Sequence, residues 1–235
     1  MKTNLIIIPT YNEKENIEAI VRATMKAVPD SDFLIVDDNS PDGTAEIVRQ
    51  KLVPHGRVNM LNRARKGGLA GAYIAGFDWA GQKGYQQVVQ MDADFSHAPA
   101  DVAKVVAALT GHDLVIGCRY MDGGGTSGWS FLRTGISRGG NFYARSMLKL
   151  PFTDLTGGFT AWKLSALQKI HYSTILSRGY AFQVELKYRS FKNGLNVVEV
   201  PIHFENRKLG KSKMSSQIVV EAAFRVARLR FGHHG

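Results

Sequence analysis

The chain has few of the residues that would cross-link it or carry it through a membrane. Its 235 residues contain one cysteine, Cys118, which excludes an internal disulfide and favours a reducing compartment. No apolar run reaches the roughly 18 residues that a membrane-spanning helix needs. Only the four apolar residues 5–8 precede Pro9, too few for the apolar segment of a signal peptide. We therefore expect a cytoplasmic protein that does not cross a bilayer by itself, although it can lie on a membrane surface.

Clustered metal ligands and acidic residues are also scarce. No grouping of cysteine and histidine has the spacing of a zinc site. The 20 Asp and Glu residues are outnumbered by 30 Lys and Arg residues, and the formal net charge is +10. This balance favours an anionic partner, which leaves nucleic acid, a nucleotide, a phosphate or an acidic membrane surface open.

Apolar segments of strand length alternate with segments of helical periodicity. The expected strands cover residues 5–8, 33–36, 58–61, 87–91 and 114–118. Continuous apolar strands that alternate with helices indicate an α/β fold, with a mainly parallel sheet and helices on both faces. A hydrophobic content of 44% is enough to bury such a core. We expect one domain over residues 1–214 and a C-terminal amphipathic helix or extension over 215–235.

Local signals refine this prediction. Asn12 and Glu15 have the spacing of a capping box at a helix start, and Pro99 suits the first turn of another helix. Three consecutive glycines, residues 123–125, predict a mobile loop. The remaining expected elements are a helix over about 131–149, a late strand over 196–204 at a sheet edge because of Pro201, and a final helix over 215–231.

Polar side chains follow several of the expected strands. They lie at 9–13 (PTYNE), 37–40 (DDNS), 92–94 (DAD) and Arg119. In an open parallel sheet, ligands bind beyond the carboxyl ends of the strands. Turns favour Asp, Asn and Ser for conformational reasons alone, so one such segment says little. Four of them at the same edge favour a binding site.

The two aspartates of the third segment predict a metal site. Residues two apart in a strand point the same way, so Asp92 and Asp94 can converge. Two close carboxylates stay ionised together only near a cation. Oxygen ligands suit Mg²⁺ or Mn²⁺, which use one or two carboxylates together with substrate phosphates. The pair therefore indicates a diphosphate substrate whose negative charge grows as it leaves.

Taken together, these segments resemble the inverting glycosyltransferases of family two, which have a GT-A (Rossmann-like) fold, and within that family the polyprenol (dolichol) monophosphate mannose synthases. The matching segments are 9–17, 36–44, 62–77, 91–99, 117–120, 133–138, 154–162, 179–186 and 206–214. They cover nearly the whole chain in order. Each is common alone, but the set is specific.

The resemblance implies a role for each matching residue. Those implied to line the guanosine pocket are Pro9, Tyr11, Glu13, Val36 and Asp38. Those implied to hold the metal and the diphosphate are Asp92, Ala93 and Asp94, and those implied to receive the lipid phosphate are Arg119, Arg133 and Ser137. Arg119 would also contact the donor, and Arg207 and Lys213 would clamp it from a closing loop. The residues expected to act directly in transfer are Asp94, Arg119, Arg133 and Ser137.

One position departs from the family pattern. The family usually has Gln two residues after the second Asp, as a further metal ligand, and this chain has Ser96. The shorter hydroxyl predicts weak ligation by Ser96, or ligation through water. Glu185 is expected to be a buried cap or ion-pair partner rather than a catalytic base.

The implied reaction moves mannose from GDP-mannose to a polyprenyl (dolichyl) monophosphate and yields polyprenyl β-mannosyl phosphate. A UDP-glucose-dependent glucosyltransferase acting on the same lipid is the nearest alternative. A non-catalytic nucleotide-binding module is a further one. Nucleic acid is disfavoured as a partner, because the basic segments lack the interleaved aromatic residues of single-strand binders.

A lipid acceptor implies peripheral contact with the cytoplasmic face of a membrane, directly or through a membrane protein. The final helix places Gln217, Glu221, Arg225 and Arg228 along one face. Two interpretations stay open. The helix packs on the core as an ordinary amphipathic helix, or it lies on a membrane with its arginines against anionic lipid.

Overall fold

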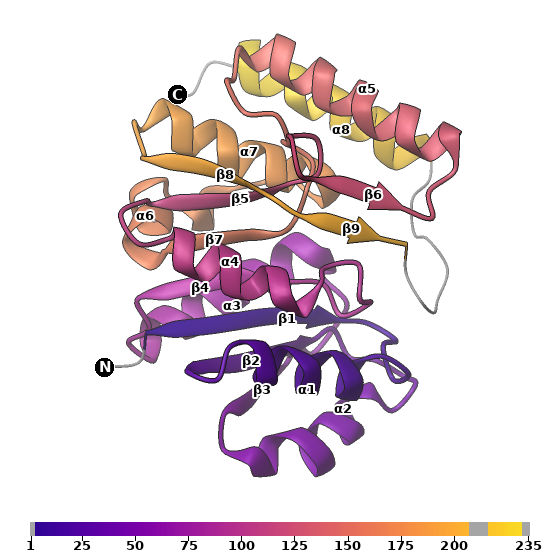
Figure 1. Ribbon diagram of the computed structural model, residues 1–235, viewed down its shortest axis with the longest axis vertical. Coiled ribbons are helices and arrows are strands. Elements are labelled where there is room, and N and C mark those ends of the chain that lie inside the picture. Colours follow the sequence, from indigo (N-terminus) through magenta and orange to yellow (C-terminus); the bar gives the residue numbers. More distant parts are fainter. Residues whose placement is uncertain (1–2, 207–215, 232–235) are drawn as a thin grey trace.

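A seven-stranded sheet forms the centre of the computed structural model, which describes residues 3–206 and 216–231. Its strand order is β3-β2-β1-β4-β7-β5-β8 (Figure 1). The strands are β1 (Asn4–Thr10), β2 (Ser31–Asp37), β3 (Val58–Asn62), β4 (Gln87–Gln90), β5 (Leu114–Cys118), β7 (Thr160–Lys163) and β8 (Val197–Pro201). Neighbours pair in parallel, except that β7 runs antiparallel to both β4 and β5. The predicted mainly parallel α/β sheet is confirmed.

Helices cover both faces of this sheet. One face carries α1 (Ile17–Ala27), α2 (Thr44–Ile47), the short turns η1 (Val48–Leu52) and η2 (Val53–His55), and α4 (Pro99–Ala108). The other carries α3 (Gly68–Gln82), α6 (Leu164–Lys169), η3 (Tyr172–Thr174) and α7 (Gly179–Lys192). Two further helices, α5 (Phe131–Leu148) and α8 (Ser216–Phe231), lie side by side beyond α7 at one end of the molecule (Figure 1). A small second sheet joins β6 (Gly125–Ser127) to β9 (His203–Glu205).

The strand residues explain why the sheet is covered twice. Leu5 and Ile7 of β1 belong to the core beneath α3 and α7, whereas Ile6 and Ile8 belong to the core beneath α1 and α4. All four are fully buried. Burying one such side chain contributes about 1.5–3 kcal/mol, so a strand that is apolar on both faces is stable only between two helical layers.

Several local predictions are confirmed. Helix α4 begins at Pro99, and α5 covers almost the predicted residues. Strand β8 ends at Pro201 on the edge of the sheet. The capping box is wrong: α1 begins only at Ile17, and Asn12 has a left-handed φ of 60°. The predicted glycine loop is interrupted, because Gly125 starts β6.

The C-terminal helix α8 packs on the core and also presents exposed residues. Val226 and Leu229 are buried in the same core as α3 and α7. On its outer side, Phe224 and Phe231 are exposed together with Arg228. The side chain of Gln217, predicted for its polar face, lies outside the described residues. No helix within the described ranges has the length and apolar character to span a membrane.

Close packing of α3 on β1 gives a test of the fold. A Cβ on Gly76 would lie 2.8 Å from Ile7 Cγ2, whereas a Cβ on Gly81 of the same helix would meet Leu164 at an ordinary 3.6 Å. Both alanine variants gain the same helix propensity. We expect Gly76→Ala to be less stable than Gly81→Ala by about 1–3 kcal/mol, the usual cost of overpacking. Urea unfolding of the two variants measures this difference, and equal midpoints would contradict the packing.

Candidate active site

The carboxyl ends of the parallel strands form one edge of the sheet, and most of the predicted site lies there. Strands β2 and β4 flank β1, so the residues that follow these three strands lie close together. Strand β5 points the same way but is separated from β4 by the antiparallel β7. Asp92 follows β4 and Arg119 follows β5. The first residue of β7, Thr160, lies between these two strands at this edge, so Asp92 and Arg119 are not direct neighbours.

Two cavities open at this edge. The strand-end cavity has a volume of about 300 Å³, and the helix-side cavity has a volume of about 360 Å³. The predicted residues that line the strand-end cavity are Pro9, Tyr11, Glu13, Asp38, Asp92, Ala93, Asp94 and Arg133. Those that line the helix-side cavity are Asp92, Arg119, Arg133 and Ser137. The cavities meet at shared lining residues, which are Asp92, Arg133, Thr156, Gly158 and Tyr180.

Two predicted site residues line neither cavity. The side chain of Val36 on β2 is fully buried in the core and lines neither cavity, so its place beside a guanosine stays a prediction. Ser96 is 1% exposed and lines neither cavity, and its weak or water-mediated ligation of a metal stays a prediction. Its backbone explains the burial, because its carbonyl accepts the Glu205 N–H and its N–H donates to Asp94. Arg207 and Lys213, the predicted clamp, lie outside the described residues.

A tight turn after β4 holds the two aspartates. Phe95 adopts a left-handed φ of 62°, and Asp94 Oδ1 accepts the Ser96 N–H at 3.0 Å. The Asp92 N–H donates to His97 Nδ1 at 3.1 Å. Because that nitrogen accepts, neutral His97 carries its proton on Nε2. Burial lowers the pKa of His97, although the two carboxylates oppose the shift, so the ring is neutral near pH 7.

The carboxylate pair makes a negative potential that suits a cation. The two carboxylates also lie close enough to the buried phenol of Tyr73, on α3, to affect its pKa. Burial, and then the charges of Asp92 and Asp94, raise the Tyr73 pKa well above its ordinary value. The described residues contain no group of three or more Asp, Glu, His or Cys side chains that could hold a metal. Asp92 and Asp94 therefore fit a cation whose remaining ligands come from a bound substrate.

The far wall of the strand-end cavity is polar and carries charges of both signs, from Glu13, Asp38 and Lys66. Lys66 Nζ lies 3.8 Å from the centre of the Tyr11 ring, a cation–π contact. Asp38 is paired within the protein: Arg63 binds one carboxylate oxygen at 2.5 Å, and the N–H groups of Gly67 and Gly68 donate to the other. Asp38 therefore shapes the wall by fixing the start of α3.

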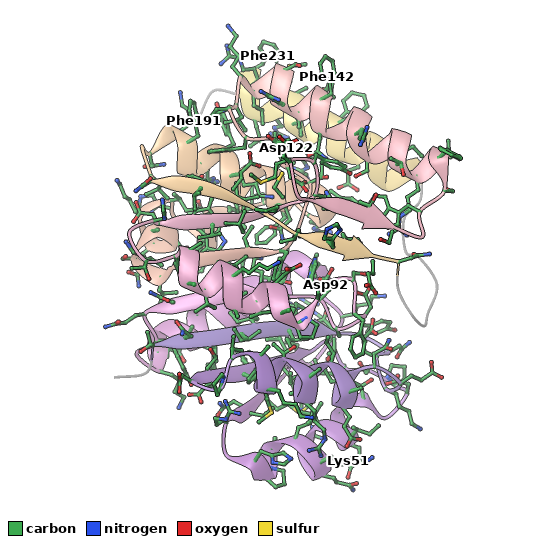
Figure 2. All side chains as sticks on the ribbon, in the orientation of Figure 1. Lys51, Asp92, Asp122, Phe142, Phe191 and Phe231 are labelled. Carbon is green, nitrogen blue, oxygen red and sulfur yellow. The ribbon has the colours of Figure 1, made fainter. Side chains whose placement is uncertain are left out.

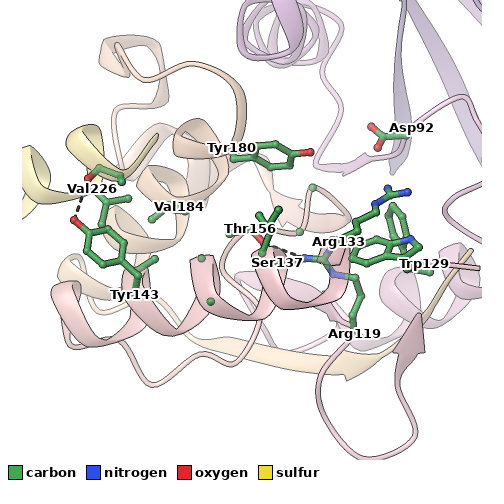
Figure 3. A pocket seen from close by; sticks show the side chains of 18 of the residues that line it. Asp92, Arg119, Trp129, Arg133, Ser137, Tyr143, Thr156, Tyr180, Val184 and Val226 are labelled. Atoms are coloured by element: carbon green, nitrogen blue, oxygen red, sulfur yellow. Dashed lines mark hydrogen bonds between the residues drawn. The ribbon is translucent and has the colours of Figure 1, made fainter. Parts of the chain in front are cut away.

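Arginines dominate the polar end of the helix-side cavity (Figure 3). Arg133 lines both cavities, and its guanidinium stacks 4.1 Å from the Trp129 ring. Ser137, one turn later on α5, accepts the Tyr120 hydroxyl at 2.7 Å. These groups hold positive charge and hydrogen-bond donors opposite Asp92, which is an arrangement for binding an anion.

Arg119 is positioned by a buried ion pair. Its Nε and Nη2 bind the two oxygens of Asp154 at 2.7 and 2.8 Å, and Nη2 also donates to Thr156. Burial alone raises the pKa of the Asp154 carboxyl. The Arg119 charge and its hydrogen bonds outweigh burial, so that pKa lies below its ordinary value. The guanidinium is thereby fixed in the wall of the helix-side cavity.

The loop of residues 153–158 is held from three further sides. The fully buried Lys187 donates to the carbonyls of Leu155 and Gly157, and burial lowers its pKa to about 8. Asn141 Oδ1 accepts the Leu155 and Thr156 N–H groups, and the Glu199 carboxylate accepts those of Thr153 and Asp154. This loop supplies Thr156 and Gly158 to both cavities, so the junction between them is rigid.

The other end of the helix-side cavity is apolar. It lies between α5, α7 and α8, and its lining there includes Ile136, Tyr143, Ala144, Val184 and Val226. The Tyr143 hydroxyl donates to the Ala223 carbonyl at 3.1 Å and ties α5 to α8 (Figure 3). The cavity can therefore accept a ligand with an anionic head and an apolar tail.

Sequence reasoning missed several residues of the site. The lining residues without a predicted role include Lys66, His97, Trp129, Thr156, Tyr180 and Gln183. Of these six, only Trp129 lies outside the matching segments. Trp129 has no signal in the sequence, because its loop approaches the site only through the pairing of β6 with β9. Glu185 was predicted correctly, since it pairs with Arg189 at 2.6 Å.

Comparison with known proteins gives a consistent result. A family model described as "Glycosyl transferase family 2" matches residues 5–171. A polyprenol monophosphomannose synthase of Mycolicibacterium smegmatis is 45% identical over 225 residues, which cover 95% of this chain and 85% of that protein. An undecaprenyl-phosphate mannosyltransferase of Micrococcus luteus is 45% identical over 224 residues, which cover 95% and 92% of the two chains.

Solved structures share the fold at low sequence identity. Glucosyl-3-phosphoglycerate synthase from Mycobacterium tuberculosis, in complex with Mn²⁺, UDP and glucosyl-3-phosphoglycerate, has a TM-score of 0.70 at 18% identity, covering 97% of this chain and 80% of that one. A mannosyltransferase from Pyrobaculum calidifontis in complex with GDP-Man and Mn²⁺ has a TM-score of 0.61 at 16% identity, covering 97% and 70%. The GT-A fold implied by the sequence is confirmed.

The buried ion pair gives a prediction with a pH dependence. Asp154→Asn leaves the Arg119 charge buried without its partner, which typically costs about 3–5 kcal/mol. The pKa of Asp154 is depressed in the folded state, so its contribution is complete above the unfolded value of about 3.9 and is lost as pH falls through the folded value. The difference from wild type should therefore be large at pH 7 and shrink towards pH 3.

Urea unfolding at the two pH values measures this effect. Glu46→Gln is the control, because Glu46 makes only exposed contacts, an ion pair with Arg49 at 3.8 Å and a hydrogen bond from Gln50, and exposed ion pairs contribute less than about 1 kcal/mol. Equal losses for the two variants at pH 7 would show that the Arg119–Asp154 pair does not stabilise the fold.

Proposed function

This chain belongs to glycosyl transferase family 2, and from that premise we propose that it transfers mannose from GDP-mannose to the phosphate of a polyprenyl (dolichyl) monophosphate. The product is polyprenyl β-mannosyl phosphate, because attack opposite the departing diphosphate inverts the anomeric carbon. The observation that carries the proposal is the junction of the two cavities, where the carboxylates of one meet the arginines of the other.

The strand-end cavity is the proposed donor site. Its outer part, between Tyr11, Asp38 and Lys66, would hold the guanosine. Its inner part, at Asp92 and Asp94, would hold the diphosphate. The polar outer wall suits a base and ribose, and the carboxylates suit a metal-bound diphosphate.

Asp92 and Asp94 would hold a divalent cation, Mg²⁺ or Mn²⁺. Their place together in the wall of the strand-end cavity supports this assignment, and two carboxylates with substrate phosphates are a common ligand set for Mg²⁺. When bound, the cation neutralises the charge that grows on the GDP leaving group. Arg207 and Lys213 are proposed to clamp the same diphosphate.

The helix-side cavity is the proposed acceptor site. Arg119, Arg133 and Ser137 would bind the lipid phosphate with charge-assisted hydrogen bonds. The apolar part between α5, α7 and α8 would take the first isoprene units. Both curated relatives are named for mannosyl transfer to a polyprenol-type acceptor, which favours mannose over glucose as the sugar.

The chemistry needs little from a general base. A phosphate monoester is already ionised at neutral pH and attacks without losing a proton to the protein. The nearby His97 is neutral and its Nδ1 is occupied by the Asp92 N–H, so it serves to hold the turn. What remains for the protein is to hold two anions together in line, with Asp92 on one side and the arginines on the other.

The α5–α8 layer is the proposed membrane-facing surface. Its exposed apolar residues include Phe131 and Phe142 on α5 and Phe224 and Phe231 on α8. Figure 2 shows Phe142 and Phe231 projecting at the end of the molecule that is opposite Lys51. Phe131 is 99% exposed beside the acceptor cavity, and Arg138 and Arg228 lie on the same two helices. Aromatic rings beside arginines suit an anionic bilayer interface.

The carboxylate pair supplies the first test of this function. We expect Asp92→Asn or Asp94→Asn to lower mannosyl transfer by at least about 100-fold at saturating Mn²⁺, because charge stabilisation of the leaving group is lost. Asp30→Asn, an exposed change at the opposite edge of the sheet, is the control. Radiolabelled transfer from GDP-mannose to a polyprenyl phosphate measures the rate.

Titration calorimetry completes this test. GDP should bind the wild type more tightly with Mn²⁺ than without it, and neither aspartate variant should show that gain. Full transfer by either variant would refute the metal role, whereas preferred binding of UDP would replace the proposed donor with the alternative one.

Vesicle flotation tests the membrane-facing surface. We expect Phe131→Ser/Phe142→Ser/Phe224→Ser to reduce binding to phosphatidylglycerol vesicles at least about tenfold, because each buried ring contributes about 1.5–3 kcal/mol. Arg225→Ala/Arg228→Ala/Arg230→Ala should lose only the preference for anionic over neutral lipid. Val53→Ser, on η2, should bind as the wild type does. Unchanged flotation of the phenylalanine variant would place the membrane contact elsewhere.

A further inference from the structure

A buried glutamine beside the cavity junction has an unsatisfied side chain. Gln183 lies in the second turn of α7 and is 2% exposed. Among the described residues, neither the oxygen nor the nitrogen of its amide has a hydrogen-bond partner. Buried polar atoms are almost always paired, because an unpaired amide loses its hydration without compensation. Such an exception in a cavity wall calls for a ligand.

The position of Gln183 narrows the choice of ligand. It lines the strand-end cavity, and Tyr180, one turn earlier on α7, lines both cavities. A Cβ on Gly158, another shared residue, would lie 3.6 Å from Gln183 Nε2. Tyr180 points toward Asp92 across the junction (Figure 3). The amide is therefore on the donor side of the place where the two cavities join.

In the proposed function, only one part of the donor, the sugar, can lie next to Gln183. The guanosine lies at the outer end of the cavity, the diphosphate lies at Asp92 and Asp94, and the acceptor phosphate lies beyond Arg133. Only the sugar occupies the space between them. We propose that the Gln183 amide binds hydroxyl groups of the transferred sugar, an inference that rests on the proposed function.

The hydrogen-bonding groups of the amide match a sugar better than they match the phosphate groups on either side of the sugar. A primary amide offers two N–H donors and one acceptor oxygen. Phosphate oxygens only accept, and would leave the amide oxygen against negative charge. Two sugar hydroxyls, one accepting from Nε2 and one donating to Oε1, satisfy both atoms. Gln183 is thus a specificity-determining residue, because a sugar without the matching hydroxyl leaves the buried amide unpaired.

Gln183→Leu tests the proposal, with Gln168→Leu as the matched control on the exposed face of α6. Titration calorimetry with Mn²⁺ compares GDP with GDP-mannose. We expect Gln183→Leu to bind GDP as the wild type does and to bind GDP-mannose about tenfold more weakly. Its melting temperature should equal or exceed that of the wild type, because Leu removes an unsatisfied buried amide. Gln168→Leu should change neither affinity.

Deoxy analogues of GDP-mannose identify the contact. Removing the hydroxyl that Gln183 binds should weaken binding to the wild type but not to Gln183→Leu. Analogues that lack any other hydroxyl should bind more weakly to both proteins, and by the same factor. This non-additivity separates a direct contact from a general change in the shape of the cavity.

The outcomes that overturn the proposal differ from those that overturn the function. Unchanged GDP-mannose affinity in Gln183→Leu, or an equal loss of GDP and GDP-mannose affinity, would remove Gln183 from the sugar site. If the wild type binds UDP-glucose instead of GDP-mannose, the proposed donor is wrong. The same comparison of UDP with UDP-glucose then decides the role of Gln183.

Discussion

The buried ion pair between Arg119 and Asp154 is the interaction on which the active site depends. It fixes a guanidinium in the wall of the helix-side cavity, and the same carboxylate accepts the N–H of Gly157. One side chain therefore sets both the position of the charge and the path of the loop between the cavities. The buried ammonium group of Lys187 donates to two carbonyls of that loop. These hydrogen bonds hold the loop and offset part of the cost of burying the charge.

The charges around the junction explain how one small site can bring two phosphates together. Asp92 and Asp94 lie in one wall of the junction and Arg119 and Arg133 in the other, and in the proposed function they would hold a metal-bound diphosphate and a second anion, respectively. Both walls are held by hydrogen bonds to rigid elements, so little reorganisation is needed at the moment of transfer. Between them the wall carries neutral polar groups, such as Gln183, which suits a sugar with hydroxyls and no charge.

Much of the fold follows from sequence periodicity, and the main exception has consequences for the site. Five parallel strands and both long outer helices were predicted from apolar runs and helical spacing. The antiparallel β7 was not, because its four residues, TAWK, do not form a continuous apolar run. It separates β4 from β5, so Asp92 and Arg119 lie about two strand spacings, or roughly 10 Å, apart. In the proposed function, that gap would hold the sugar between the two phosphates.

By itself, the sequence determined which residues end the strands and which of them carry charge. The Asp92–Asp94 pair, the arginines and the order of the matching segments are local patterns. Such patterns can be recognised in the sequence without knowledge of the fold. Only the tertiary structure decided that the side chains of Val36 and Ser96 are buried, that Arg133 stacks on Trp129, and that Gln183 lies unpaired at the junction. These features depend on contacts between distant segments, where packing, and not the identity of neighbours in the chain, sets the direction of a side chain.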